Sequence, residues 1–211
     1  MRILVAGATG QTGRLLTHQL ADSGHTPVAL VRESSDVSVL PAGCETRTGD
    51  LQDLPQGIAD NVDAIVFAAG SGGDTGEEMT DRIDRDGAKA LIDVAKNSGI
   101  ERFVMLSSVG ADRPSSGPDG LQHYLEAKQA ADQHLEQSGL NYTIVRPVRL
   151  TNEGLTGQIT LSTDHLNSGE ISRADVASTL AASLGEPAAS NRIFEIASGP
   201  TDISTAIKSL H

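Results

Sequence analysis

The sequence predicts a three-layer α/β protein with a doubly wound, mostly parallel sheet and a small C-terminal elaboration. Short apolar runs alternate with helical patterns along the chain, as they do in βαβ units. A glycine-rich turn joins the first apolar run to the first helical pattern. The chain has three Phe, two Tyr and no Trp, so its core must be built from Ala, Val, Leu and Ile, which suit a parallel sheet covered on both faces.

Seven segments are expected to form strands, namely Ile3–Ala6, Val28–Val31, the polar Glu45–Thr48, Ala64–Ala68, Phe103–Leu106, Thr143–Arg146 and Ile193–Ile196. Helices are expected at residues 11–22, 79–98, 121–138 and 173–184. In the second of them, apolar residues recur at three- and four-residue steps and form one face. Ser172 and Asp175 are expected to cap the last helix.

The length of 211 residues fits one domain with an elaborated C-terminal part. No linker or internal repeat divides the chain, so residues 1–211 are expected to form a single domain. Residues from 148 onward would then cover the substrate side. Two polar, glycine-containing loops, at residues 71–76 and 111–120, follow expected strands and should lie at the carboxyl edge of the sheet, where ligands bind in open α/β folds.

The composition argues against several classes of partner. A formal net charge of −12 repels phosphate backbones and anionic membranes, and no apolar run is long enough to span a bilayer. Cys44 is the only cysteine, and no His stands at a metal-ligand spacing from another His or Cys, so neither a disulfide nor a metal site is expected. We expect a cytoplasmic protein with a small-molecule substrate, and the oligomeric state stays open.

A strand, a glycine turn and a helical pattern follow one another at the N-terminus, which predicts a Rossmann fold that binds a nicotinamide dinucleotide. Gly7 permits the tight turn, Gly10 lets a phosphate approach the backbone, and Gly13 allows the helix to pack on the strand. Free N–H groups and the helix dipole then face the diphosphate. The remaining cofactor-binding residues of this turn are Thr9, Gln11 and Thr12.

The residue after the second strand selects between the two nicotinamide cofactors, because a carboxylate there binds the ribose 2′-hydroxyl and an arginine accommodates a 2′-phosphate. Arg32 stands at this place and favours NADP(H), and two serines, Ser34 and Ser35, could add hydroxyl donors. Glu33 is the alternative: a shift of one residue would present a carboxylate and favour NAD(H).

Two further segments are expected to contact the cofactor. Asp50, followed by Leu51, stands where a carboxylate can meet the exocyclic amine of adenine, although a simple turn or cap explains it equally well. The fourth strand ends in Ala68, Ala69 and Gly70, whose small size would let the adenosine half lie against the backbone.

Several segments together resemble the atypical branch of the short-chain dehydrogenase/reductase superfamily, which is similar to NmrA-like proteins and small biliverdin/flavin reductases. Besides the glycine turn, these segments are residues 49–50, 84–88, 103–108, 124–128, 142–147 and 171–177. The resemblance covers nearly the whole chain. It implies an NAD(P)-dependent oxidoreductase or epimerase-like protein, although several relatives act as cofactor sensors without turnover.

The resemblance also implies catalytic residues. Tyr124 and Lys128 are four residues apart in a helical pattern and share a face. In the family such a tyrosine exchanges a proton with the reacting oxygen, the lysine lowers its pKa and binds the nicotinamide ribose, and a serine, here Ser108, polarises the same oxygen. Ser107 and Pro147 would lie against the cofactor. The alternative is that the lysine serves only the ribose and the tyrosine only lines the pocket.

The chain departs from the family pattern at two places. Asp84, Arg85 and Asp86 stand where conventional members carry a catalytic Asn, which argues against the usual proton relay. Arg149 stands near the usual position of a glycine, either to select an anionic substrate or as a surface charge.

Three functions fit these residues. The first is an NADP(H)-dependent reductase acting on a small carbonyl, quinone-like or flavin-like compound. The second is a binding protein that senses NADP(H) without turnover. The third is a sugar-nucleotide epimerase or dehydratase, which the short C-terminal region disfavours.

Overall fold

The computed structural model describes residues 1–72, 75–166 and 168–210. Gly73 and Asp74, which belong to the first expected loop, lie outside the described residues, as do Asn167 and His211. Among the described helices, none has the length and apolar composition that crossing a membrane requires.

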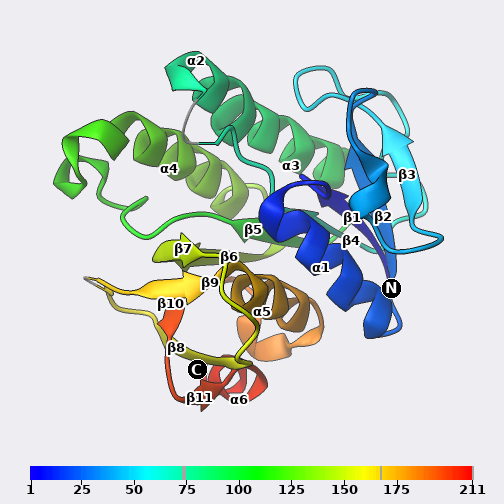
Figure 1. Cartoon of the computed structure of the whole chain (residues 1–211). Coiled ribbons are helices and arrows are strands. Elements are labelled where there is room, and N and C mark those ends of the chain that lie inside the picture. The colour runs from blue at the N-terminus through cyan, green and yellow to red at the C-terminus, as the bar shows by residue number, and fades with distance from the viewer. Residues whose placement is uncertain (73–74, 167, 211) are drawn as a thin grey trace.

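A nine-stranded sheet forms the centre of the fold (Figure 1). Its strands are β1 (Arg2–Ala6), β2 (Thr26–Val31), β3 (Glu45–Thr48), β4 (Ala64–Phe67), β5 (Arg102–Leu106), β6 (Asn141–Pro147), β8 (Gln158–Ser162), β10 (Arg192–Ser198) and β11 (Thr201–Asp202). They are ordered β11-β8-β10-β6-β5-β4-β1-β2-β3, and only the pairings of β8 are antiparallel. The strand order reverses at β1, which lies between β2 and β4, so the fold predicts a ligand crevice at their carboxyl ends.

Helices cover both faces of this sheet. On one face α1 (Gln11–Asp22) packs against α5 (Arg173–Gly185), and on the other α3 (Ala88–Asn97) packs against α4 (Gln122–Glu136), as Figure 1 shows. Side chains of one strand alternate between the layers: Ile3 and Val5 belong to the core beneath α1 and α5, whereas Leu4 and Ala6 belong to the core beneath α3 and α4. The expected three-layer doubly wound α/β fold is confirmed.

The helix expected at 79–98 differs in one respect. It begins earlier, as α2 (Gly76–Thr80), and continues through a π-helical segment, Asp81–Gly87, before α3. A π turn contains one more residue than an α turn and therefore rotates the side chains that follow it, which is why such segments are frequent at functional sites. The periodicity of the sequence predicts the helix but does not reveal this local widening.

The C-terminal third contains elements that the sequence pattern did not predict. β7 (Arg149–Thr151) and β9 (Glu170–Ser172) pair as a small parallel sheet, β8 and β11 extend the main sheet, and α6 (Ile203–Lys208) follows. These strands are short or lie at an edge, so tertiary pairing rather than local pattern forms them. The expected cap of α5 is confirmed, because the Ser172 hydroxyl accepts a hydrogen bond from the Asp175 N–H.

Candidate active site

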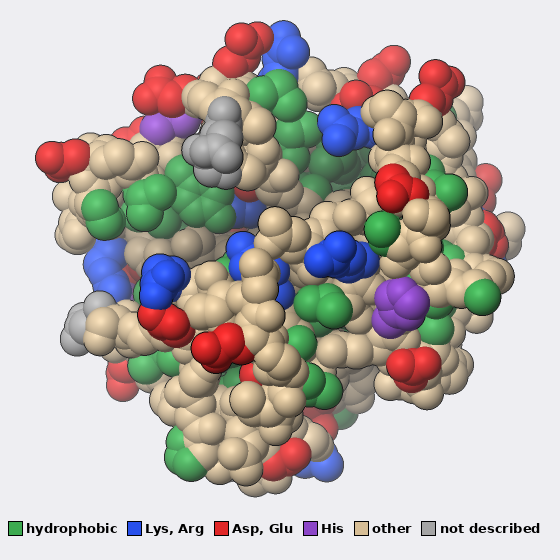
Figure 2. Space-filling model, in the orientation of Figure 1, with side chains coloured by type: hydrophobic (Ala, Val, Ile, Leu, Met, Phe, Trp, Pro, Cys, Tyr) green, Lys and Arg blue, Asp and Glu red, His purple; other side chains and the backbone are tan. Residues whose placement is uncertain are grey.

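A cleft of about 690 Å³ opens at the carboxyl ends of the central strands, at the crevice that the strand order predicts. Figure 2 shows its open side, a hollow with basic side chains along it, while acidic side chains are scattered mainly toward the edges of the view. One end of the cleft, the Arg32 end, lies beside β2, and the other, the Tyr124 end, lies beside α4. The glycine turn lies along it and contributes Gly7, Thr9, Gly10, Gln11 and Thr12.

The turn can exist only with glycine at its key positions. Gly7 has φ +78°, and a Cβ there would lie 2.6 Å from the backbone of Ala69. The Gly10 N–H closes the turn by donating to the Gly7 carbonyl at 2.9 Å. Gly13 does not line the cleft; it packs directly on the Gly7 backbone, where any Cβ would collide. Its contribution is therefore to bring α1 close to β1.

The first turn of α1 presents free donors to this cleft. Gly10 is the N-cap and supplies no side-chain cap, and the first turn contains no acidic residue. The N–H groups at the helix start therefore keep their capacity to bind an anion, which the helix dipole also attracts. These features fit a diphosphate lying across the turn.

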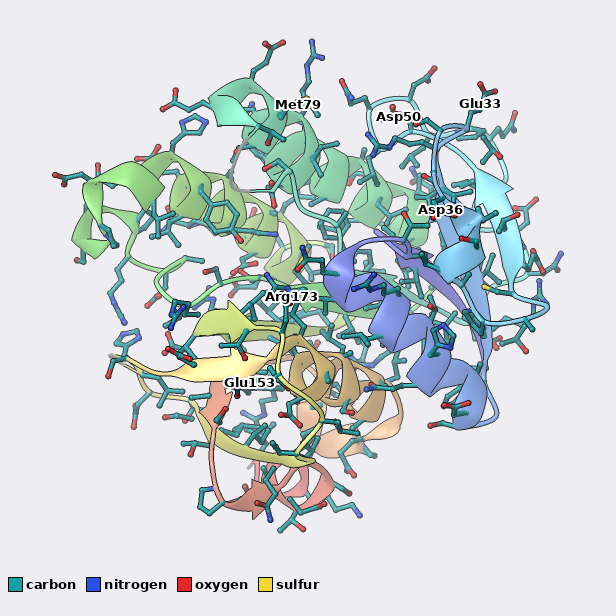
Figure 3. The ribbon with its side chains drawn as sticks, viewed as in Figure 1. Glu33, Asp36, Asp50, Met79, Glu153 and Arg173 are labelled. Atoms are coloured by element: carbon teal, nitrogen blue, oxygen red, sulfur yellow. The ribbon has the colours of Figure 1, made fainter. Side chains whose placement is uncertain are left out.

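At the Arg32 end, the exposed Arg32 side chain lines the cleft and forms no ion pair with any carboxylate that the structure describes. Ser35 also lines it, and its hydroxyl accepts the Arg32 N–H at 3.0 Å. Glu33 is not a lining residue and points outward at the rim of the molecule (Figure 3). The arrangement therefore presents a cation, rather than a carboxylate, to a ligand at this end.

Asp50 and Leu51 line the cleft next to this arginine. One oxygen of Asp50, Oδ1, accepts the Gln52 N–H at 2.9 Å, so the carboxylate also stabilises its own turn. Asp50 can therefore stabilise its turn through Oδ1 and still contact an adenine amine through Oδ2, which takes no part in that hydrogen bond. Ala68, Ala69 and Gly70 line the middle of the cleft, as the cofactor interpretation requires.

The Tyr124 end brings together side chains from three elements. Tyr124 and Lys128 of α4 line the cleft, and Lys128 Nζ lies 5.7 Å from the centre of the tyrosine ring. The Lys128 ammonium also donates to the Leu106 carbonyl at 3.3 Å. Ser107 lines the cleft, whereas Ser108 is not a lining residue and its hydroxyl donates to the Val109 carbonyl at 3.3 Å.

Two other candidate residues lie outside the cleft. Pro147 is buried at the end of β6, and its carbonyl accepts the Val109 N–H at 3.1 Å, so it supports the loop after β5 rather than lining the cleft. Arg149 is exposed and pairs with Glu170 across the small sheet. That placement agrees with the surface-charge alternative for Arg149.

The partner of Lys128 is Asp84, from the π-helical segment. Asp84 Oδ1 lies 2.9 Å from Lys128 Nζ, and both side chains are almost entirely buried. The approach is off the direction that a good hydrogen bond needs, so the contact is mainly an ion pair. A carboxylate thus neutralises the lysine that was expected to act on the tyrosine alone.

This carboxylate changes the expected acidity of Tyr124. Burial raises the pKa of Tyr124, repulsion from Asp84 and Asp132 adds to the rise, and Lys128 and Ser108 only partly oppose it. Burial disfavours the charge on Lys128, but attraction to Tyr124, Asp84 and Asp132 outweighs it and raises the lysine pKa. The expected lowering of the tyrosine pKa is therefore absent, and at neutral pH the pair is a neutral phenol beside an ammonium.

Behind Ser107 lies a second buried charge pair. The Ser107 hydroxyl donates to Asp132 Oδ2 at 2.8 Å, and Arg146 donates to the same oxygen from Nε at 3.1 Å and Nη2 at 2.9 Å. Burial raises the pKa of Asp132 to about 6, with Arg146 acting in the opposite direction. Because the Ser107 hydroxyl proton is used in the hydrogen bond to Asp132, Ser107 can only accept a hydrogen bond from a ligand in the cleft.

Sequence reasoning missed several lining residues. Met79 and Ile83 supply an apolar wall, Leu150 another, and Arg173 a second cation without a described carboxylate partner. Met79 and Arg173 lie at opposite margins of the cleft in Figure 3. Arg173 donates to Asn152 Oδ1 at 2.8 Å. The sequence signal that could have identified Arg173 is its position directly after the Ser172 cap, at the start of a helix.

Comparison with known proteins identifies the family. The model of a family described as NAD(P)H-binding matches residues 7–187, which include the glycine turn and α4. The chain belongs to this NAD(P)H-binding family. Membership agrees with the resemblance to atypical short-chain dehydrogenases, and the cleft features described above fit the dinucleotide that gives the family its description.

Three similar proteins match this chain over all or nearly all of their length. An uncharacterized sugar epimerase of Bacillus subtilis, YhfK, is 42% identical, with 100% of both chains covered. A Bacillus halodurans structure, provisionally named an NAD-dependent epimerase/dehydratase, is 40% identical with a TM-score of 0.95 and full coverage of both chains. The oxidoreductase ylbE of Lactococcus lactis is 29% identical with a TM-score of 0.88, covering 100% of this chain and 96% of that one.

Proposed function

We propose that this protein is an NADP(H)-dependent reductase that transfers a hydride to a small carbonyl, quinone-like or flavin-like substrate. The observation that carries the proposal is Tyr124 with Lys128 Nζ 5.7 Å from its ring centre, at one end of a cleft that the glycine turn also lines. A phenol that keeps its proton at neutral pH is suited to donate it to a developing alkoxide. It is poorly suited to remove a proton from an alcohol. The reductase proposal uses Tyr124 as this proton donor.

The choice of NADP(H) rests on Arg32. Its guanidinium lines the cleft at the end of β2, has no described carboxylate partner, and is accompanied by Ser35. An arginine at this position can bind a 2′-phosphate through charge-assisted hydrogen bonds. The outward direction of Glu33 supports this choice over NAD(H).

In this mechanism a bound reduced nicotinamide supplies the hydride. Tyr124 gives its hydroxyl proton to the substrate oxygen as that oxygen takes the electron pair of the carbonyl bond, and water then returns a proton to the phenolate. Lys128 stabilises the transient phenolate through its charge. Ser108 acts on the pKa of Tyr124 in the same direction. The glycine turn and the start of α1 hold the diphosphate in place.

The substrate class follows from the walls at the Tyr124 end. Met79, Ile83 and Leu150 are apolar and the tyrosine ring is flat, so they favour a planar or modest-sized apolar compound. Within the described residues, only Leu150 and Arg173 represent the C-terminal third in the lining, which leaves little enclosure for a sugar nucleotide.

Epimerisation is the second candidate because the names of two close relatives favour it. Such a reaction returns the hydride to the same substrate and leaves no net change in the cofactor. A sensor would bind NADPH tightly and catalyse nothing. A measurement of cofactor consumption therefore separates the reductase, which consumes NADPH, from the epimerase and the sensor, which do not.

The test is NADPH oxidation with a panel of quinones, flavins, aldehydes and ketones, followed in Tyr124→Phe and Tyr142→Phe. These are the only two tyrosines, and Tyr142 does not line the cleft, so Tyr142→Phe is a matched control. We expect wild-type and Tyr142→Phe protein to oxidise NADPH, and Tyr124→Phe to lose turnover by about 100-fold or more with unchanged NADPH affinity. Tight NADPH binding without oxidation of any compound would overturn the reductase proposal and leave the sensor and the epimerase.

A further inference from the structure

Asp84 lies where three parts of the site meet. Its side chain is completely buried, with one carboxylate oxygen facing Lys128 of α4 at 2.9 Å. The other oxygen, Oδ2, accepts the N–H of Ser71 at 3.0 Å, in the turn after β4 that lines the cleft. A Cβ at Gly70 would lie 3.4 Å from Asp84 Oδ1, so the turn and the carboxylate are in close contact.

The π-helical segment separates Asp84 from its acidic neighbours. Asp81 and Asp86 pair with Arg85 near the surface, and Asp81 also contacts His123. Asp84 alone among these carboxylates is directed into the protein. The widened helical turn therefore delivers a single carboxylate to the base of the cleft.

Fold stability alone gives a weak reason for this arrangement. Removing two charges from water is costly, and apolar side chains of similar volume usually stabilise a fold at least as well as a buried ion pair does. In this buried pair Asp84 contacts a cleft-lining turn, and Lys128 lies beside Tyr124. Its position indicates a function in the site.

We propose that Asp84 is a positioning residue: its carboxylate fixes the Lys128 ammonium beside Tyr124, anchors the Gly70–Ser71 turn through the same side chain, and so makes Tyr124 a proton donor. This inference rests on the proposed reductase function for its catalytic meaning. The contact itself can be tested without turnover.

The charged groups that face Tyr124 explain the expected effect. Lys128 and Ser108 favour the phenolate, whereas Asp84 and Asp132 disfavour it. Asp132 is held by Arg146, which leaves Asp84 as the carboxylate paired directly with the lysine. Without the Asp84 charge, the ammonium would act on the phenol with less opposition, and the phenol would release its proton at lower pH.

The experiment is a spectroscopic titration of Tyr124 in a Tyr142→Phe background. The chain has two tyrosines and no tryptophan, so the ultraviolet absorbance of tyrosinate then reports Tyr124 alone. Asp84→Asn keeps an acceptor for the Ser71 N–H but removes the charge. We expect the titration midpoint to fall by about one pH unit. Asp86→Asn, on the same segment but exposed, is the control and should leave the midpoint unchanged.

Turnover provides a second readout on the same variants. If Tyr124 donates a proton, the pH above which kcat declines should fall in Asp84→Asn together with the tyrosinate midpoint, with the NADPH KM changing less than kcat. A folded Asp84→Asn protein whose midpoint is unchanged or higher would overturn the inference, as would an equal fall in Asp86→Asn. A shifted midpoint in a protein that reduces nothing would leave the Asp84 contact intact and refute only the reductase function.

A second variant covers the case in which Asp84→Asn does not fold. Asp84→Glu keeps the charge but lengthens the side chain, so it cannot keep the contacts with Lys128 and Ser71 in the same geometry. We expect a tyrosinate midpoint near that of wild type and a kcat reduced about tenfold. Wild-type kcat in Asp84→Glu would show that the carboxylate position is immaterial and would overturn the inference.

Discussion

The two ends of the cleft are built on different principles. The diphosphate part, next to the Arg32 end, uses backbone N–H groups and missing side chains from one contiguous stretch, residues 7–13. The Tyr124 end uses buried charges from α4, the π-helical segment and the turn after β4. In the diphosphate part, an added side chain would collide with the backbone. At the Tyr124 end, removal of one charge would leave its buried partner unpaired. Substitutions at the two ends should therefore fail in different ways.

The largest effect is expected from Lys128→Met. It leaves the Asp84 carboxylate buried without a partner, which costs about 3–5 kcal/mol of unfolding free energy. Turnover should also be lost, because Lys128 holds the charge beside Tyr124. Thermal or urea unfolding measures the stability. The control is Lys96→Met, whose side chain is exposed on α3 and should change neither quantity. Wild-type stability in Lys128→Met would contradict a buried charge pair at this end.

The next effect is a pH dependence of stability that arises from Asp132. Its pKa is raised from 3.8 to about 6 in the folded state, so between these values the folded protein keeps a proton that the unfolded chain has lost. Stability from this group is fully present below pH 3.8 and is lost as pH rises through about 6, with a slope of about 1.4 kcal/mol per pH unit. Unfolding measured from pH 4 to 7 should show this slope in wild type and in Glu126→Gln, a variant of an exposed residue on the same helix. A slope that persists in Asp132→Asn would refute the assignment.

At the Arg32 end, Arg32→Ala should separate the two cofactors. Loss of a charge-assisted contact to the 2′-phosphate costs about 1.5 kcal/mol, so the Kd for NADPH should rise about tenfold while that for NADH stays constant. Calorimetric titration with both nucleotides measures this. Arg14→Ala, on the outer side of α1 and away from the cleft lining, is a suitable control. An equal loss for both nucleotides would place Arg32 away from the 2′-phosphate.

The smallest effect is expected from Arg173→Ala. This cation lines the cleft from the start of α5, across from the apolar wall, and has no described carboxylate partner. If it contacts the diphosphate, NADPH and NADH should both bind about fivefold more weakly, a loss of about 1 kcal/mol. Unchanged nucleotide affinity with a raised substrate KM would instead assign Arg173 to an anionic substrate.

Local sequence was enough to predict the parts of the site that depend on contiguous residues. The strand, turn and helix around Gly7 and Gly10 occur where expected, and the pairing of Tyr124 with Lys128 follows from helical spacing. Ser108 and Pro147 follow or end strands as expected, yet neither lines the cleft: Ser108 lies in the turn after β5, and Pro147 is buried at the end of β6, where its carbonyl accepts the Val109 N–H. The short strands β7 and β9 depend on each other, so neither segment alone indicates them.

The sequence by itself determined the doubly wound fold and the dinucleotide turn, since glycine conformation, helix N-termini and apolar periodicity are local properties. Only the tertiary structure decided the protonation of the site. Asp84 and Lys128 are far apart in the chain and meet because the π-helical segment and α4 pack side by side over β5. Electrostatic energy depends on distance and burial, and both are settled only when the layers have come together.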